Sequence, residues 1–329
     1  MITKFIILQD LSLNGGTRQA LKLYDSDDSF RAAIIKPKKF YNPRFIFNFF
    51  KLFYIYKGKF RFTFIDKPLT PSKNNIVIST SYLTLSYVSD ISHSNHIHYF
   101  QHIELWDLYK SKYFQNYCVK NGYPDGKKIY EIIKLHKSSF FDEYLLRIGL
   151  IKNFYTVSNF LKDFLINVNK NQNLKINIMP VAPHIGENLP VIKKKMYTLF
   201  FLRGFPYKGD DMVYKLLKSN IFKHKYVVFS HYPKLSKIFF LLKNGINFSI
   251  KPSDCKLSKI FNKTNILVNS SYSEGFGSIT IEANAYGAKI ISSNTGWLVG
   301  RFKVNGYRIV KNHRKIDYVK AYKELLCSE

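Results

Sequence analysis

The chain has 329 residues, of which 46% are hydrophobic, so it is long enough for two ordinary domains with separate cores. Its 51 Lys and Arg against 22 Asp and Glu give a net charge of +29, which favours nucleic acid, an anionic membrane surface or phosphorylated substrates as partners. The three cysteines, Cys118, Cys255 and Cys327, are too far apart to share a metal or redox motif, which excludes a cysteine-based metal or redox centre.

The N-terminal residues run into a short apolar strand without a cleavage site, so we expect no signal peptide. The longest apolar and aromatic run, 45–56, is interrupted by Asn48 and Lys51 and is too short to span a bilayer. Together with reduced thiols, these features favour a cytoplasmic protein.

Strands and helices alternate through the first half of the chain. The run 4–8 predicts a strand, 14–17 a turn and 18–24 the start of a helix, which is how a doubly wound α/β domain opens. Further strands are predicted at 32–35, 75–79, 154–158 and 176–180, a strand ending in a loop at 96–106, and a helix at 159–168.

The stretch 40–62 interleaves Phe and Tyr with Lys and Arg. Such a surface could lie on an anionic membrane or stack on nucleic-acid bases. The alternative is a helix and a strand packed on the core with their lysines outward, and we favour it because aromatic stripes usually belong to a core.

Two patterns invite a metal interpretation, which we reject. Asp25-Ser26-Asp27 matches an Asp-x-Asp motif but follows a helix and is typical of a turn. The histidines between 93 and 102 alternate along a strand, so they share one face without a tetrahedral arrangement. We therefore expect no metal.

The second half follows a predicted linker, 186–195, which contains Pro190 and three lysines. It repeats the alternation of strand and helix, although no internal sequence repeat is evident. Strands are predicted at 199–202, 226–229, 246–250, 265–269, 289–293 and 307–310, and helices at 235–243, 257–261, 281–287 and 317–326.

A loop with two glycines joins the strand 265–269 to the helix 281–287. Gly275 and Gly277 let the backbone approach a ligand closely, and the free N–H groups at the helix start favour an anion. Glu274 is predicted on the loop, with a second glutamate eight positions later in the helix. This arrangement suits a nucleotide sugar, with phosphates at the helix start and hydroxyls on the two carboxylates.

The segment that begins at Glu274, Glu-Gly-Phe-Gly followed by Glu-Ala-x-Ala-x-Gly-x-x-Ile-Ile-x-Ser, resembles the two-glutamate signature of retaining GT-B glycosyltransferases, glycosyltransferase family four. The alternative is an ordinary turn between strand and helix with solvated glutamates. The resemblance implies an α/β GT-B fold, with two Rossmann-like domains facing a cleft and a C-terminal helix crossing back. The expected parts are an acceptor-side domain at 1–185, the linker 186–195, a nucleotide-sugar domain at 196–312, and a helix at 313–329 that packs back towards the first domain.

The resemblance also implies roles for individual residues. Arg203 and Lys208 match the family's Gly-Arg, four residues, Lys-Gly pattern, apart from Leu202 in place of the glycine, and they are expected on the donor diphosphate. Glu274 is expected on the sugar hydroxyls and Glu282 on the ribose. Backbone N–H groups for the donor are expected from Gly275, Phe276, Gly277, Ser278 and Ile279.

Two contacts are expected from the first half. Gly15 and Gly16 either contact the donor phosphates or only form a tight turn. The segment 96–106 is similar to one in some rhamnan-type members, which implies that His102 or Gln101 lies at the anomeric centre with Glu104 nearby. The expected catalytic residues are thus Glu274, His102, Arg203 and Lys208.

The sequence therefore predicts a retaining glycosyltransferase of hexosyltransferase type, without cofactor or metal. It would move a sugar from a nucleotide-diphosphate sugar to a glycan, lipid or protein acceptor, in the cytoplasm and on the inner face of an anionic membrane. The alternatives are a nucleotide-sugar epimerase of the same fold, and a basic nucleic-acid-binding protein, which the motif argues against.

Overall fold

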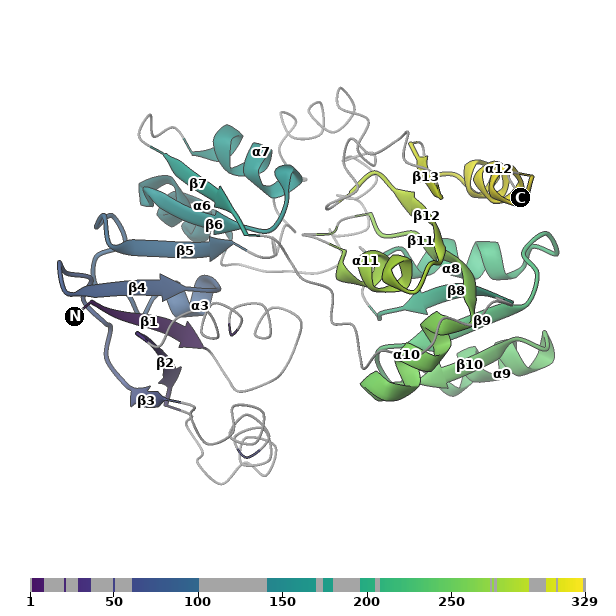
Figure 1. Cartoon of the computed structure of the whole chain (residues 1–329), viewed down its shortest axis with the longest axis horizontal. Coiled ribbons are helices and arrows are strands. Elements are labelled where there is room, and N and C mark those ends of the chain that lie inside the picture. The colour runs from purple at the N-terminus through teal and green to yellow at the C-terminus, as the bar shows by residue number, and fades with distance from the viewer. Residues whose placement is uncertain are drawn as a thin grey trace. The chain divides into compact units, whose positions relative to one another are not determined.

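The computed structural model describes residues 2–8, 21, 29–36, 50, 61–100, 141–169, 174–179, 196–204, 208–272, 274, 277–295, 306–311 and 313–327. The chain divides into two compact units, and each contains one parallel β-sheet with helices (Figure 1). Most of the sequence before β2 lies outside the described residues, including the turn 25–27 and the predicted helix 18–24 except Leu21. The predicted linker 186–195 and most of the basic aromatic stretch 40–62 lie outside them as well.

The first unit contains a seven-stranded sheet in the order β3-β2-β1-β4-β5-β6-β7. The chain order reverses between β1 and β4, as in doubly wound folds. The strands are β1 Thr3–Leu8, β2 Phe30–Ile35, β3 Phe62–Ile65, β4 Asn75–Ser79, β5 His96–Phe100, β6 Asn153–Thr156 and β7 Lys175–Ile178, and the helices are α3 Tyr82–Leu85, α6 Phe141–Leu150 and α7 Asn159–Val168.

Most of these elements lie where the sequence predicted them. The prediction that β6 extends to Ser158 is wrong, because Ser158 is the N-cap of α7 and its hydroxyl accepts a hydrogen bond from the Leu161 N–H at 3.3 Å. The strand β3 and the helix α6 were not predicted from the sequence.

The second unit contains a six-stranded sheet in the order β10-β9-β8-β11-β12-β13, which reverses between β8 and β11. Its strands are β8 Tyr197–Leu202, β9 Lys225–Phe229, β10 Asn247–Ile250, β11 Thr264–Asn269, β12 Lys289–Ser293 and β13 Tyr307–Val310. Its helices are α8 Asp210–Leu217, α9 Leu235–Lys243, α10 Asp254–Asn262, α11 Ser278–Ala285 and α12 Lys315–Leu326. All the elements predicted in this half are present, and α8 is an addition.

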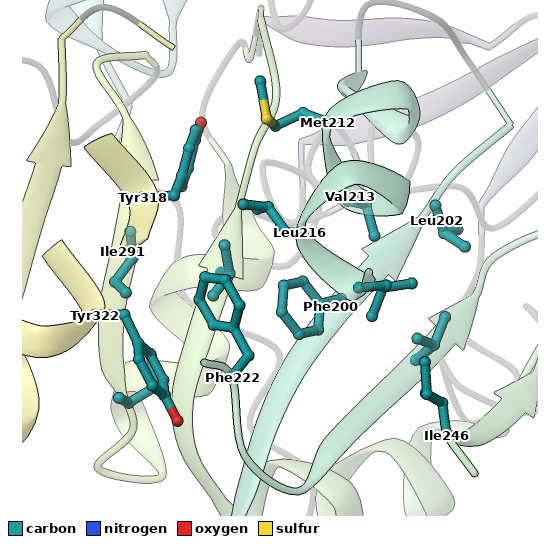
Figure 2. Packing of buried hydrophobic residues seen from close by; sticks show 14 of the residues in the cluster. Phe200, Leu202, Met212, Val213, Leu216, Phe222, Ile246, Ile291, Tyr318 and Tyr322 are labelled. Carbon is teal, nitrogen blue, oxygen red and sulfur yellow. The ribbon is translucent and has the colours of Figure 1, made fainter. Parts of the chain in front are cut away.

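Helices cover both faces of this second sheet. Phe200 and Leu202 of β8 point to one face, where they pack with Met212 and Leu216 of α8 (Figure 2). Leu199 of β8 points to the other face, into the cluster that α10 and α11 supply. The central strands are therefore apolar on both sides, as expected for a parallel sheet between two helical layers.

The C-terminal helix α12 packs on β12, β13 and α8 of the second unit. Tyr318 and Tyr322 are buried in the same cluster as Phe200 (Figure 2), and Leu325 belongs to it as well. The Tyr322 hydroxyl accepts a hydrogen bond from the Lys223 N–H at 3.1 Å. The return of this helix towards the first domain stays a prediction. No helix of the described ranges has the length and hydropathy needed to cross a bilayer.

Candidate functional site

The loops after β8 and β11 leave the second sheet side by side, at its switch point. Neighbouring parallel strands that lead in opposite directions leave a crevice at their carboxyl ends, where ligands of doubly wound folds bind. Arg203 and Lys208 lie on the loop after β8, and Glu274 lies on the loop after β11. The topology therefore brings together the two cations and the first glutamate that the sequence singled out.

Glu274 is the centre of this cluster. Its Oε1 lies 2.7 Å from Nη1 of Arg203, and its Oε2 lies 2.6 Å from Nζ of Lys208. The Ser271 hydroxyl donates a third hydrogen bond to Oε1 at 2.6 Å. The side chains of Glu274 and Lys208 are 6% and 9% exposed, whereas that of Arg203 is 19% exposed. Two cations thus share one buried carboxylate, and the guanidinium is the part of the cluster that solvent reaches most.

Burial and charge act in opposite directions on the protonation of these groups. Burial alone raises the pKa of Glu274, but Arg203, Lys208 and the hydrogen bonds from Lys208 and Ser271 outweigh it and lower the pKa to about 2. For Lys208, burial is the largest effect and lowers the pKa to about 8, although Glu274 raises it. The carboxylate is therefore ionised at neutral pH, and the ammonium group titrates close to the physiological range.

The loop after β8 is fixed by a glycine and an aspartate. Gly209 has a left-handed backbone (φ +73°), and a Cβ there would lie 1.8 Å from the Ser270 carbonyl oxygen, so only glycine fits. The Asp210 carboxylate accepts the backbone N–H groups of Arg203 at 3.0 Å and Gly204 at 2.9 Å. The turn that carries Arg203 and Lys208 is thus held by hydrogen bonds to Asp210, the first residue of α8.

The loop after β11 is held by buried polar side chains. The Asn269 amide donates to the Ser292 hydroxyl at 3.1 Å, and the Ser293 hydroxyl donates to the Ser271 carbonyl. These bonds tie the end of β11 to the end of β12, so Ser271 is placed to reach Glu274.

His313 supports the same loop from the segment before α12. Its Nε2–H donates to the Ser270 carbonyl at 2.7 Å, and its ring stacks on Tyr272. The Tyr272 hydroxyl donates to Asp211 of α8 at 3.2 Å. His313 has a left-handed backbone (φ +52°), a strained conformation for a residue other than glycine.

The helix α11 begins beside this cluster. Its N-cap, Gly277, is left-handed (φ +81°) and provides no side-chain cap, and a Cβ there would lie 3.8 Å from Cγ of Glu274. The N–H groups of Ser278 and Ile279 belong to the first turn, where a helix favours an anion. Glu282 is half-buried one turn further along, at the position that the spacing predicted.

Several predicted site residues cannot be placed. The following lie outside the described residues: Gly15, Gly16, Gln101, His102, Glu104, Gly275 and Phe276. The structure does describe the strand before His102. There His96 Nε2 and His98 Nδ1 both contact the Ser79 hydroxyl, at 2.9 and 2.7 Å, and all three side chains are buried. Among the described residues, no three His, Cys, Asp or Glu side chains form a group suited to a metal ion.

Sequence reasoning missed the residues that support the site. Asp210 had a signal, because an acidic residue after Lys-Gly suits the first turn of a helix. Ser271 lies three residues before Glu274 but looks like any loop serine. His313 had no signal at all, since it is 39 positions away from Glu274 in the sequence and acts through tertiary packing.

Comparisons with known proteins agree with this architecture. Residues 185–329 match the family model for glycosyl transferases group 1. No curated protein matches the chain in sequence.

Solved structures resemble the whole chain. Sucrose-phosphate synthase from Thermosynechococcus elongatus is 12% identical, with a TM-score of 0.63 over 99% of this chain and 90% of its own. Anabaena HepE in complex with UDP is 10% identical, with a TM-score of 0.67 over 100% and 90%. An S. aureus TarM variant in complex with fondaparinux, alpha-GlcNAc-glycerol and UDP is 12% identical, with a TM-score of 0.64 over 99% and 93%. At these identities the likeness shows the fold, so the chain has a GT-B fold. The match over residues 185–329 shows that this part of the chain is similar to glycosyl transferases group 1.

Proposed function

We propose that the protein is a retaining glycosyltransferase that moves a hexosyl unit from a nucleotide-diphosphate sugar to a glycan, lipid or protein acceptor. The observation that carries this proposal is the cluster at the switch point, where Arg203 and Lys208 converge on buried Glu274 beside the start of α11. A site with two cations and a helix N-terminus suits a diphosphate, and a neighbouring carboxylate suits sugar hydroxyls.

The cations would act on the leaving group. When the bond between the anomeric carbon and the diphosphate breaks, negative charge grows on the phosphate oxygen. Arg203 and Lys208, held in place by Glu274, would stabilise that charge together with the first N–H groups of α11. This is the work that a divalent cation does in other transferases, and we propose that transfer needs none here.

The two glutamates would each bind a different sugar of the donor. We propose that Glu274, which lies next to the cations, also accepts hydrogen bonds from hydroxyls of the transferred sugar. Glu282, on α11, would accept those of the ribose. The place of His102 or Gln101 at the anomeric centre, and the phosphate contacts of Gly15 and Gly16, remain part of the proposal. We place the reaction in the cytoplasm, at the inner face of an anionic membrane.

A thermal-shift panel of nucleoside diphosphates tests the donor site, because each ligand raises the melting temperature according to its affinity. Uridine diphosphate leads the panel, since HepE and TarM structures contain UDP. We expect one base to stabilise the protein and Arg203→Ala to weaken that ligand about 10–100-fold, the range for loss of one charge-assisted bond. Lys218→Ala, which removes an exposed lysine at the end of α8, is the matched control. If no diphosphate stabilises the wild type, the proposal fails.

Transfer itself is tested with the matching nucleotide sugar. NMR of the first product should show the anomeric configuration of the donor, and turnover should persist in EDTA. An inverted product would refute retention, and loss of turnover in EDTA would refute metal independence. Conversion of the donor to an isomer without any acceptor would instead identify an epimerase.

A further inference from the structure

The helix α9 has an apolar face turned to solvent. Leu235, Phe239 and Leu242 are spaced four and three positions apart, so they lie on one side of the helix, and they are 70%, 65% and 59% exposed. Tyr232, just before the helix, is 76% exposed. A surface helix normally turns polar residues outward, so this face is unusual.

The opposite side of α9 packs on the hydrophobic core of the second unit. Leu241 is fully buried, and Phe240 packs against the core cluster and edge-on to Tyr214 of α8. The helix is thus anchored on the sheet by its inner side, beside the edge strand β10 (Figure 1). The outer leucines and phenylalanine contribute little to the core, and contiguous exposed apolar side chains of this kind mark an interaction surface.

The stretch of sequence that contains α9 carries charge of a single sign. Residues 212–253, which include α9 and the strands on either side of it in sequence, contain eight lysines and no Asp or Glu. Lys234 and Lys243 are exposed at the two ends of the helix, and Lys237 is exposed within it. Lys251 lies over the exposed ring of Tyr232, with Nζ 4.6 Å from the ring centroid.

We propose that this α9 surface, formed by Tyr232, Leu235, Phe239 and Leu242 with their flanking lysines, docks on an anionic membrane. Leucine and phenylalanine side chains would enter the boundary between headgroups and acyl chains, and the lysines would contact lipid phosphates. Tyrosine suits this boundary because its ring is apolar and its hydroxyl is polar.

Two other occupants fit the surface less well. A second copy of the chain, docked about a twofold axis, would bring the lysines of one α9 against those of the other. A protein partner would need an interface core surrounded by lysine, a residue that such interfaces avoid. The anionic bilayer satisfies both the apolar stripe and the charge. The inference names the surface that would hold the protein at the proposed membrane, and it does not rest on the transfer reaction, because the α9 surface includes none of Arg203, Lys208 and Glu274.

Vesicle flotation tests the proposal on the full chain. We expect binding to vesicles of phosphatidylcholine mixed with phosphatidylglycerol, and weak binding to phosphatidylcholine alone. The triple variant Leu235→Ser, Phe239→Ser, Leu242→Ser should bind the mixed vesicles at least about tenfold less. The double variant Lys234→Gln, Lys243→Gln should also bind less and lose part of its salt sensitivity.

The matched control is the double variant Leu146→Ser, Leu150→Ser on α6 of the first unit, whose side chains are 74% and 57% exposed. We expect it to bind the mixed vesicles like the wild type. Equal binding by the α9 triple variant and the wild type, or no binding by the wild type, would overturn the proposal. Conversion of a wild-type dimer to a monomer by the triple variant, without any vesicle binding, would assign the surface to a second copy.

A fluorescent variant gives a readout that does not depend on losing contacts. Phe239→Trp should show emission that brominated lipids quench in mixed vesicles, whereas the native tryptophans alone, in the wild type, should show less quenching. The thermal shift with nucleoside diphosphate should be unchanged in all these variants, so failure at the membrane and failure at the donor site are distinguishable. Absence of extra quenching in Phe239→Trp would contradict insertion of this face.

Discussion

The ring of His313 stacks on the ring of Tyr272, with centroids 4.0 Å apart and planes inclined by 19°. The same histidine donates to the Ser270 carbonyl, so it holds the residues on both sides of Ser271 in the loop that leads to Glu274. His313 comes from the segment between β13 and α12, far from Glu274 in sequence. It acts as a positioning residue for the carboxylate that organises both cations.

His313→Ala should therefore weaken the donor site. Loss of the buried hydrogen bond and the stacked ring should lower the free energy of unfolding by about 1–3 kcal/mol, and a loosened Glu274 should raise the dissociation constant for nucleoside diphosphate. His313→Asn is the control for backbone strain, because asparagine tolerates a left-handed conformation but lacks the ring. If calorimetry gives wild-type affinity for both variants, His313 has only a structural role.

Glu274→Gln should separate binding from turnover. The amide keeps the shape of the side chain but leaves Arg203 and Lys208 without their shared anion, so the variant should be less stable by about 3–5 kcal/mol. A diphosphate replaces the missing charge, so it should raise the melting temperature more than in the wild type. Transfer should nevertheless be lost, as the sugar hydroxyls lose their carboxylate. A variant that binds diphosphate poorly and still transfers sugar would reverse these assignments.

Affinity for nucleoside diphosphate should fall as the pH rises through about 8. Burial lowers the pKa of Lys208 to about 8, and only the protonated ammonium attracts the diphosphate. Above that pH, binding must take up a proton, so the dissociation constant should rise by up to about tenfold per pH unit. Lys208→Arg should remove this dependence, because a guanidinium stays charged. Titration calorimetry from about pH 7 to about pH 10 measures both proteins, and parallel profiles would contradict the role of Lys208.

Gly209→Ala should lower the free energy of unfolding far more than Gly245→Ala, although both glycines have a left-handed backbone conformation. A Cβ at Gly209 would lie 1.8 Å from the Ser270 carbonyl oxygen, whereas nothing lies within 4 Å of a Cβ at Gly245. Each substitution costs about 1–2 kcal/mol of backbone strain, and at Gly209 overpacking adds about 1–3 kcal/mol or more. Urea unfolding measures the difference. Equal costs would mean that the loops after β8 and β11 separate easily.

Stability should decline as the pH falls below about 6.5. Burial lowers the pKa of His96 to about 4 and that of His98 to about 3. Below about pH 6.5 these histidines therefore bind protons in the unfolded chain but stay neutral in the folded chain. Each histidine thus contributes a slope of up to about 1.4 kcal/mol per pH unit between its folded and unfolded pKa values. Urea unfolding at several pH values should show a shallower slope for His98→Gln than for the wild type. His93→Gln is the control, and an unchanged slope in His98→Gln would contradict this origin.

The sequence predicted those features of the fold and the site that depend on local pattern. The alternation of short apolar strands with amphipathic helices identified the six described strands of the second unit. The spacing of Arg203 from Lys208 and of Glu274 from Glu282 singled out the two loops. The bonds that Glu274 makes to both cations bridge 71 and 66 positions, so they depend on the order of the strands and not on any local pattern.

Other features depend on packing and could not be predicted in the same way. The periodicity of α9 identified a helix, but which of its two apolar sides would be covered depended on the helices around it. His313 reaches the site only because the segment between β13 and α12 lies against Ser270, just after the end of β11. The length of β6 was overestimated, because a serine that caps the next helix also fits a strand pattern.

The central strands β8 and β11 are packed on both faces by side chains that take no part in the ionic cluster. The sheet with its helical layers and the loops after β8 and β11 can therefore change independently during evolution. Substitutions in the loops can change the preferred base or sugar while the layers beneath stay intact. A chain about 10% identical to its structural neighbours can in this way keep their architecture and diverge in chemistry.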